Sequence, residues 1–454
     1  MGSDTDHEDL LRKGASVSEA TTPTAEDEVV DLCRDLIRID TSNYGDGSGP
    51  GERRAAEYVA GQLAEVGLEP TLLESEPGRA SVIARWPGED PTRDALLVHG
   101  HLDVVPADAS DWKVDPFAGE VADGCVWGRG AVDMKDMDAM VLAVVREWRR
   151  QGRRPPRDVV LAFLADEEAG GTKGSHWLAA NHPGLFEGCT ESISEVGGFS
   201  FTVPDGTRVY LLQTAQKGIA WLRLVAKGTA GHGSMVNTDN AVTELAEAVA
   251  RIGRHEWPVR LTPTVRTFLD EMSDALGVPL DHDHPKALLV HLGTLARIVG
   301  ATLRNTTNPS RLNAGYKTNV IPQTATAEVD GRFLPGFEDE FLATIDELLG
   351  PKVRREVVHR DIALETTFDG ALVDAMVGAL KAEDPSCRVV PYCLSGGTDD
   401  KAFSQLGIRG FGFAPLQLPP DLDFSGMFHG VDERVPVESL RFGVRVLDRF
   451  LATS

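Results

Sequence analysis

Apolar positions along the chain follow a helical spacing in some segments and a strand spacing in others. Near the start, residues 28–39 and 53–66 show the helical spacing and predict two helices. Short apolar runs rich in branched residues predict strands at 80–86, 95–98 and 159–164, with a helix at 135–149 before the last strand. Strands that alternate with helices predict an α/β sheet with helices on both faces.

The pattern changes after residue 214 and returns from residue 363. Between them it predicts strands at 220–226, 311–316, 324–332 and 353–359, helices at 240–252 and 338–349, and an inserted helical segment near 264–302. Helices at 371–382 and 437–451 follow. We therefore predict a flexible N-terminal segment (1–27), a discontinuous α/β catalytic domain (28–214 and 363–454) and a smaller α+β domain between its two parts (215–362).

Composition narrows the range of partners. The 454 residues include 45 basic and 70 acidic side chains, and the resulting charge of −25 repels phosphate backbones and anionic lipid surfaces. The first 28 residues lack the apolar core of a secretion signal, and no stretch approaches the roughly 20 apolar residues that cross a bilayer. Five scattered cysteines argue against a disulfide framework. We expect a cytoplasmic protein that binds neither nucleic acid nor membrane.

A histidine and an aspartate follow the apolar run that ends at residue 98. Ligands of open α/β sheets gather at the carboxyl ends of strands, which is where His101 and Asp103 are expected. If His101 binds a metal ion, a carboxylate two residues later could hold its other ring nitrogen. An ordinary exposed strand end is the alternative, and this motif alone does not decide between them.

Acidic residues follow at two further places. Asp133 ends a glycine-flanked loop before a predicted helix, where it could bridge two cations or cap the helix. Asp166, Glu167 and Glu168 directly follow a predicted strand, and adjacent like charges require compensating cations or raised pKa values. One carboxylate could bind a metal ion while its neighbour takes a proton from water. A solvated acidic turn is the alternative.

Two more candidate ligands lie further along the chain. Glu195 ends a short predicted strand before two glycines, and His429 precedes the last predicted helix. Glu191 is the alternative to Glu195, but it falls inside the strand rather than at its end. Two histidines and three carboxylates suit paired zinc, manganese or cobalt ions better than calcium, which prefers oxygen ligands alone.

Four ordered motifs resemble one known family. They are Gly100-His101-Leu102-Asp103-Val104-Val105-Pro106, Gly128-Arg129-Gly130-Ala131-Val132-Asp133-Met134-Lys135, Asp166-Glu167-Glu168 and Gly396-Gly397-Thr398-Asp399. They resemble the co-catalytic zinc metallopeptidases, which include aminoacylase, carboxypeptidase S, glutamate carboxypeptidase, acetylornithine deacetylase and succinyl-diaminopimelate desuccinylase. The resemblance spans roughly residues 28–452, and segments 295–308 and 315–322 look most similar to the carboxypeptidase S-like branch.

The resemblance implies a fold and a set of metal ligands. The catalytic domain would have a mixed, mainly parallel sheet, and the smaller domain would be a ferredoxin-like lid that mediates homodimerisation. Asp133 would bridge two divalent metal ions, zinc first and cobalt or manganese as alternatives. Glu168 and His429 would complete one metal site, and His101 and Glu195 the other.

The resemblance also implies catalytic roles. Glu167 would be the general base, and Asp103 would orient His101. Two positions depart from the family pattern: Asp136 stands where many relatives carry glycine, and Val196 separates Glu195 from the glycines that follow.

Three residues of the predicted lid complete the expected site. His232 matches a lid histidine that in relatives helps to hold the tetrahedral intermediate, often in the partner's active site. With Asn319 and Arg332 it would bind the oxyanion and the substrate carboxylate, for which the forked guanidinium of arginine is suited. A surface cation at a strand end is the alternative interpretation of Arg332.

These expectations predict a hydrolase that cleaves the amide bond of an N-acyl amino acid or of a short peptide with a free carboxylate. Two metal ions would activate water, and Glu167 would remove its proton. A metal-dependent phosphoesterase and a catalytically silent binding protein are the rival hypotheses. The excess of acidic over basic side chains argues against a phosphoesterase. The presence of every candidate ligand and of the candidate base argues against a catalytically silent protein.

Overall fold

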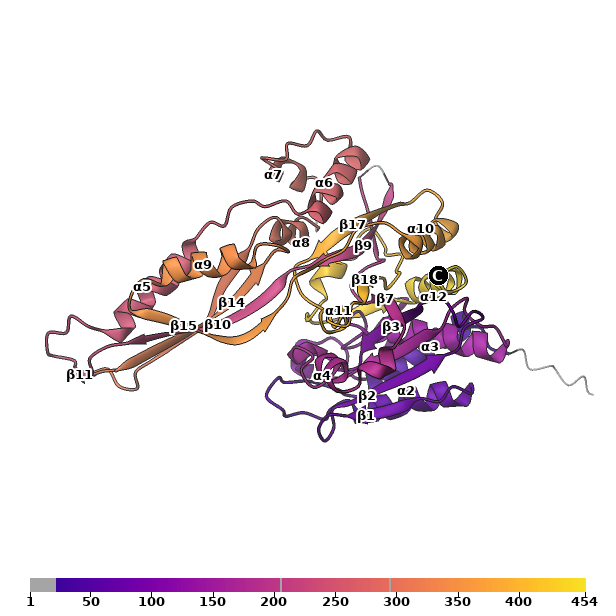
Figure 1. The fold of residues 1–454 in the computed structure, drawn as a ribbon, viewed down its shortest axis with the longest axis horizontal. Coiled ribbons are helices and arrows are strands. Elements are labelled where there is room, and N and C mark those ends of the chain that lie inside the picture. Colours follow the sequence, from indigo (N-terminus) through magenta and orange to yellow (C-terminus); the bar gives the residue numbers. More distant parts are fainter. Residues whose placement is uncertain (1–21, 205, 294) are drawn as a thin grey trace, which may run out of the picture.

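The chain folds into two units of unequal size (Figure 1). The computed structural model describes residues 22–204, 206–293 and 295–454. The larger unit is built around a ten-stranded sheet, and the smaller unit around a separate four-stranded sheet. Figure 1 shows the smaller unit as an elongated arm that extends from one side of the larger unit.

The large sheet is mixed, with parallel strands at its centre. Its main path runs β1-β2-β6-β3-β7-β18-β9-β16, while β8 and β17 also pair with β9. Strands β6, β3, β7 and β18 run parallel to one another, and β1 and β2 are antiparallel. The strands are β1 (Thr71–Glu74), β2 (Ala80–Trp86), β3 (Ala95–His101), β6 (Val159–Leu164), β7 (Cys189–Ser194), β8 (Ser200–Thr202), β9 (Arg208–Gln216), β16 (Leu364–Glu365), β17 (Arg388–Leu394) and β18 (Arg409–Gly412).

Helices cover both faces of this sheet, so the central strands β3 and β6 are buried along their whole length, and β6 is apolar throughout. Alternate residues of β3 enter different cores: Leu96 and Val98 join the main core, and Leu97 joins a smaller one. The helices of the main core are α1 (Ala25–Arg38), α2 (Arg53–Glu65), α3 (Lys135–Arg150), α10 (Ala371–Glu383) and α12 (Val437–Leu451). The other face carries α4 (Ser175–Asn181), η3 (Pro183–Phe186) and α11 (Asp400–Ser404).

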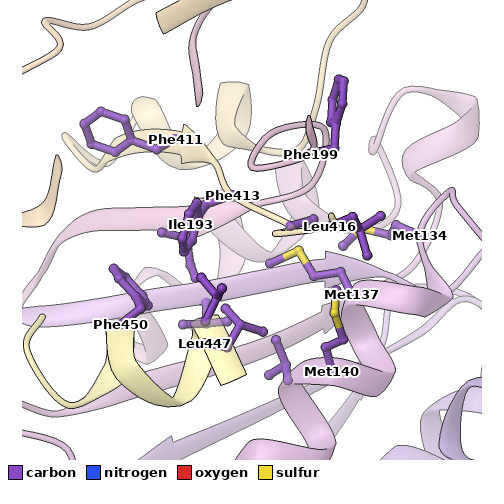
Figure 2. Packing of buried hydrophobic residues seen from close by; sticks show 14 of the residues in the cluster. Met134, Met137, Met140, Ile193, Phe199, Phe411, Phe413, Leu416, Leu447 and Phe450 are labelled. Atoms are coloured by element: carbon purple, nitrogen blue, oxygen red, sulfur yellow. The ribbon is translucent and has the colours of Figure 1, made fainter. Parts of the chain in front are cut away.

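The main core is closely packed where α3 and α12 meet the sheet. Figure 2 shows Met137 and Met140 of α3 on one side of Leu447 of α12 and Phe450 on the other, with Ile193 of β7 close to Leu447. Gly443 allows α12 to approach α3, because a Cβ atom there would lie 2.0 Å from the sulfur of Met140. The helix that closes the chain is therefore fixed against the helix that follows Asp133.

The smaller unit has the βαββαβ connectivity of a ferredoxin-like fold. Its antiparallel strands lie in the order β12-β14-β10-β15. The elements in chain order are β10 (Gly218–Lys227), α5 (Ala241–Arg254), β12 (Thr306–Ala314), β14 (Thr324–Phe333), α9 (Glu338–Leu349) and β15 (Val353–Asp361). Alternate residues of β10, among them Leu222 and Leu224, pack under α5 and α9 in a core separate from that of the larger unit.

Shorter elements connect and extend these units. A two-stranded antiparallel sheet formed by β11 (Gly231–His232) and β13 (Val320–Ile321) lies at the far end of the arm. The inserted helical segment contains α6 (Pro263–Leu276), α7 (Lys286–Leu289) and α8 (Leu295–Thr302). A third sheet joins β4 (Glu120–Ala122), β5 (Cys125–Trp127) and β19 (Arg434–Pro436). The remaining short turns are η1 (Ala109–Asp111), η2 (Glu167–Ala169) and η4 (Phe424–Gly426).

The predicted fold class is confirmed, with differences at element boundaries. The first helix begins at Ala25 rather than at residue 28, because the Thr24 side chain caps it. The strand expected at 311–316 is wrong in its bounds: β12 begins at Thr306 and ends at Ala314. Pairing with β14 fixes these bounds, and the mostly exposed β12 carries no apolar alternation that the sequence could have revealed.

The remaining expectations concern the N-terminal segment, the inserted helical segment, the cysteines and membrane-spanning helices. The predicted flexible segment lies mostly in residues 1–21, outside the described residues. Helices α6 and α8, from within 215–362, contact β17 of the larger unit, so the inserted segment belongs to the main core rather than to the core of the arm. All five cysteines are unpaired. Among the described residues, no helix is long and apolar enough to cross a membrane.

Candidate metal centre

The candidate ligands gather because three neighbouring parallel strands end at the same edge of the large sheet. His101 is the last residue of β3 and pairs with Leu164, the last residue of β6. The acidic turn 166–168 follows β6, and Glu195 follows β7 on the other side of β3. Gly100 keeps this edge compact, since a Cβ atom there would lie 2.5 Å from Asp138. The strand order therefore brings together side chains that are far apart in sequence.

Asp133 lies between the two candidate histidines. Its Oδ1 is 3.1 Å from Nε2 of His101, and its Oδ2 is 3.2 Å from Nε2 of His429. Glu195 lies beside the first histidine, with 3.6 Å between Oε2 and Nε2 of His101. Glu168 lies beside the second, with 3.1 Å between Oε2 and Nε2 of His429. Each oxygen of the Asp133 carboxylate thus faces a different histidine, and each histidine has a different glutamate beside it.

These separations fit two divalent cations with nitrogen and oxygen ligands. Metal–ligand distances of about 2.0–2.2 Å place the ligand atoms of a tetrahedral zinc ion about 3.3 Å apart. The four distances between the histidines and the carboxylates range from 3.1 to 3.6 Å. Ligand atoms of His101, Asp133 and Glu168, and separately of His101, Glu167 and Glu195, lie within 4.8 Å of one another. Imidazole with carboxylate suits zinc, cobalt or manganese.

The electrostatics of the cluster also favour bound cations. Burial raises the pKa of Glu168 to about 7, with a further contribution from the charge of Asp133. Burial and then the charge of Glu195 raise the pKa of Glu167 well above its usual value. Hydrogen bonds to Asp133 and Glu168 raise the pKa of His429 to about 10. Nearby positive charge would relieve the repulsion among these carboxylates.

Glu167 lies next to the candidate ligands, and Asp103 lies behind them. Oε2 of Glu167 is 4.0 Å from Nε2 of His101. The Asp103 carboxylate is 3.6 Å from Nδ1 of His101 and accepts hydrogen bonds from the backbone N–H groups of Glu167 and Glu168, both at 3.1 Å. Nδ2 of Asn43, which the sequence did not single out, donates to Asp103 at 2.9 Å. Asp103 is thus placed to orient both the histidine and the acidic turn.

Glu433 was also missed from the sequence. Its side chain is fully buried, and it accepts hydrogen bonds from the backbone N–H groups of Gly130, Val132 and Asp133 and from the side chain of Arg129. Glu433 therefore joins the Asp133 loop to the segment that carries His429. The two loops are about 300 residues apart in sequence, so no local spacing reveals this contact.

The structure places Glu195, and not Glu191, beside His101. Both terminal nitrogens of the Arg157 guanidinium donate to Glu191 at 3.2 Å, at the opposite end of the sheet from the acidic turn. Asp136, one of the departures from the family pattern, is buried in the first turn of α3, where burial raises its pKa well above the usual value.

A cavity of about 400 Å³ opens beside the candidate ligands. Arg332, at the base of the arm, lines it, but its Nε and Nη2 both donate to Asp330, at 2.7 and 3.1 Å. Lys401 also lines the cavity, is buried, and was not predicted. Burial lowers the pKa of Lys401 to about 8. The cavity therefore contains a cation that sequence reasoning overlooked.

The other two predicted lid residues lie far from this cavity. His232 and Asn319 lie together at the two-stranded sheet at the end of the arm, where Gly233 N donates to the Asn319 carbonyl at 2.9 Å. Both side chains are exposed, and neither lines the cavity. In Figure 1 this two-stranded sheet is separated from the edge of the large sheet by the full length of the arm. Within one chain, the predicted trio with Arg332 is not assembled.

The motif Gly396-Gly397-Thr398-Asp399 lies in the cavity wall. Asp399 accepts a hydrogen bond from the Ser175 hydroxyl, and burial raises its pKa to about 6. Thr398 exchanges two hydrogen bonds with the side chain of Gln216, at the end of β9. This loop thus connects the candidate metal centre to the segment that leads into the arm.

A model of peptidase family M20/M25/M40 matches residues 97–453. The chain belongs to this family. Human aminoacylase-1 is 26% identical over 441 residues, which cover 94% of this chain and 96% of that protein. A probable carboxypeptidase S-like 2 from Dictyostelium discoideum is 26% identical over 393 residues, covering 80% of this chain and 72% of the relative.

A solved M20 family structure has the same fold. A metallo-carboxypeptidase from Sulfolobus solfataricus matches with a TM-score of 0.73 at 19% identity, covering 94% of this chain and 99% of the other. The resemblance drawn from the motifs is therefore confirmed, as is the assignment of this M20 family member to the hydrolases.

The Glu433 contact generates a testable prediction. Glu433→Gln should weaken metal binding about 10- to 100-fold, because it removes the charge that holds the Asp133 loop while keeping the shape of the side chain. Metal affinity is measured by competition with a chromophoric chelator, and circular dichroism verifies the fold. Glu438→Gln, at an exposed position of α12, is the matched control and should bind as tightly as the wild type. Equal affinities of the two variants would contradict this role.

Proposed function

We propose that this M20 family protein is a two-metal amidohydrolase that acts on N-acyl amino acids or on short peptides with a free carboxylate. The observation that carries the proposal is the position of Asp133, whose two oxygens face two histidines at 3.1 and 3.2 Å. A carboxylate in that position suits a bridging ligand of two cations. Support for the substrate class comes from the aminoacylase and carboxypeptidase S-like relatives.

The residues around Asp133 would complete the two metal sites. His101 and Glu195 would hold one ion, and Glu168 and His429 the other. When bound, such ions lower the pKa of water towards 7 and polarise a carbonyl group. Zinc is our first choice of metal, with cobalt and manganese as alternatives, because all three accept imidazole and carboxylate ligands.

Glu167 would act as the general base and then as the general acid. Its Oε2 lies 4.0 Å from Nε2 of His101. Its raised pKa favours a carboxyl group that accepts a proton and later releases it. The proton taken from water would pass from Glu167 to the leaving amine. Asp103 would keep His101 in position through its backbone carbonyl, which lies 2.9 Å from Nδ1 of His101, and the backbone of Glu167 through its carboxylate.

The function is tested with a substrate panel in the presence and absence of a chelator. We expect hydrolysis of N-acyl amino acids or dipeptides, loss of activity after metal removal, and recovery with zinc, cobalt or manganese. Aryl phosphates test the rival phosphoesterase hypothesis, and we expect that they are not cleaved. Activity that survives complete removal of metal, or that appears only on phosphate esters, would overturn the proposal.

Replacing the proposed base separates proton transfer from metal binding. Glu167→Gln should lower kcat about 100- to 10,000-fold, the range that a general base contributes, while the metal content stays that of the wild type. Steady-state kinetics and elemental analysis of the same preparation are the measurements. Glu347→Gln, at an exposed position of α9, is the control for the substitution itself. Near-normal turnover by the Glu167 variant with its metals bound would show that Glu167 is not the general base.

The position of His232 and Asn319 leads us to propose a homodimer. At the end of the arm they are too remote to serve the site of their own chain, but a second copy could receive them in its cavity (Figure 1). The arm would then act as the lid and dimerisation domain. His232 would stabilise the oxyanion of the partner's reaction. The domain boundaries and the cytoplasmic location remain predictions.

Mixing two inactive variants tests this exchange. His232→Ala and Glu167→Gln should each be nearly inactive alone, and subunit exchange between them should restore activity. One site of each mixed dimer would combine an intact Glu167 with an intact His232 from the other chain. Activity is measured after mixing, and the mass in solution is measured by light scattering. A monomer, or a mixture no more active than its components, would contradict the proposal.

A further inference from the structure

A buried network of hydrogen bonds lies behind Asp103. The side-chain nitrogen of Asn43 donates to Asp103 at 2.9 Å and to Asp166 at 3.2 Å. The side-chain oxygen of Asn43 accepts from Nη2 of Arg79 at 3.1 Å and from the backbone N–H of Gly45 at 3.0 Å. All four hydrogen bonds that an amide side chain can make are therefore formed, which leaves this amide a single orientation.

This amide joins the two carboxylates that hold the acidic turn. Asp103 accepts from the backbone N–H groups of Glu167 and Glu168. Asp166 begins the turn in the left-handed conformation, with φ of 71°, and its other oxygen accepts from the backbone N–H of Lys173 at 2.8 Å. A shift of the amide would therefore move the backbone that carries the candidate base and one candidate ligand.

Backbone contacts keep Asn43 in this place. Its N–H donates to the Val104 carbonyl at 2.9 Å, and Ser42 pairs with Val104 in a parallel bridge. The side chain of Asn43 is therefore held beside Asp103, and both side chains are buried. The segment before Asn43 thus runs alongside the segment that follows β3.

Arg79 and Glu52 form the far end of the network. Nη1 of Arg79 donates to Glu52, and their side chains are 5% and 0% exposed. One terminal nitrogen of the guanidinium thus serves Glu52 and the other serves Asn43. Gly51 allows this approach, because the backbone N–H of Glu52 donates to the Gly78 carbonyl at 2.9 Å and a Cβ atom at Gly51 would lie 2.6 Å from that oxygen.

We propose that Asn43 and Arg79 are positioning residues of the candidate metal centre. Arg79 fixes the Asn43 amide, and the amide holds Asp103 and the acidic turn in the arrangement that binds the metal ions. The inference rests on the proposed function, because it concerns the same two-metal site.

Asp103 transmits this effect to the first candidate histidine. Its carbonyl oxygen lies 2.9 Å from Nδ1 of His101, and a carbonyl can only accept, so Nδ1 carries a proton. In the neutral ring this leaves Nε2, which faces Asp133, free to bind a cation.

The charge of Arg79 by itself has the opposite effect on metal binding. A buried cation repels metal ions, so a purely electrostatic role predicts tighter metal binding when Arg79 is neutralised, and unchanged binding when its charge is kept. A positioning role predicts weaker binding whenever the contact with Asn43 is lost. The direction of the change in metal affinity therefore distinguishes the two roles.

Two substitutions that keep the net charge test the geometry alone. Arg79→Lys replaces two separated nitrogens by a single ammonium, which does not reproduce the fork between Glu52 and Asn43. Asn43→Ala removes the amide, leaves the buried ion pair intact, and serves on its own if Arg79→Lys folds poorly. We expect each variant to bind zinc about 10- to 100-fold more weakly than the wild type, the usual effect of losing a group that supports a metal ligand.

Equilibrium dialysis of the full-length protein against zinc buffers, followed by elemental analysis, measures the affinity without any substrate. The melting temperature of the metal-free protein reports the stability of the fold separately. Arg85→Lys, on β2, is the matched control: the guanidinium of Arg85 also pairs with a carboxylate, that of Asp158, but the side chain is 42% exposed. It should bind zinc as tightly as the wild type.

The outcomes separate this inference from the proposed function. Zinc affinity equal to or higher than that of the wild type in a folded variant would overturn the positioning role and leave the two-metal proposal intact. A lower melting temperature with unchanged zinc affinity would do the same, since it marks a purely structural network. A wild-type protein that binds no zinc would overturn the proposed function, and this inference with it.

Discussion

The structure depends on one electrostatic constraint: several carboxylates are buried together at a single edge of the large sheet. Asp133, Glu167, Glu168 and Glu195 cannot all be ionised there at low cost, which explains why the pKa values of the three glutamates are raised. His101 and His429 lie directly among these carboxylates. Bound cations are the simplest way to satisfy so many negative groups, and the ligand geometry matches that solution.

Parts of the chain that are remote in sequence keep this cluster in place. Asp103 holds the acidic turn after β6 by two backbone hydrogen bonds, and Glu433 holds the Asp133 loop by three. Both carboxylates are buried and both accept several hydrogen bonds, so they act as fixed anchors rather than as ligands. The positions of the candidate ligands therefore depend on backbone contacts as much as on the ligands themselves.

The arm is coupled to the metal centre at its base and remote from it at its tip. At the base, Gln216 bonds to Thr398, and the buried Lys401 donates to the Lys217 carbonyl in the segment that connects β9 to β10. At the tip, His232 is exposed. Arg332, at the base, thus lines the cavity of its own chain, whereas His232, at the tip, would be available to the second molecule that we propose.

The sequence alone was enough to predict the larger part of the candidate site. Apolar periodicity predicted the alternation of strands and helices, because side-chain spacing records which face of each element is buried. Since parallel strands end at one edge, the residues that follow three predicted strands could be grouped from the order of elements along the chain. The sequence also determined the family, since ordered motifs such as those around His101 and Asp133 are retained together.

Only the tertiary structure decided the rest. The choice between Glu195 and Glu191, the anchoring by Glu433 and Asn43, and the presence of Lys401 in the cavity all depend on contacts across the fold, which leave no local spacing in the chain. The separation of His232 from Arg332 depends on the length and direction of the arm. Sequence patterns report what each segment buries, whereas the folded chain decides which buried groups meet.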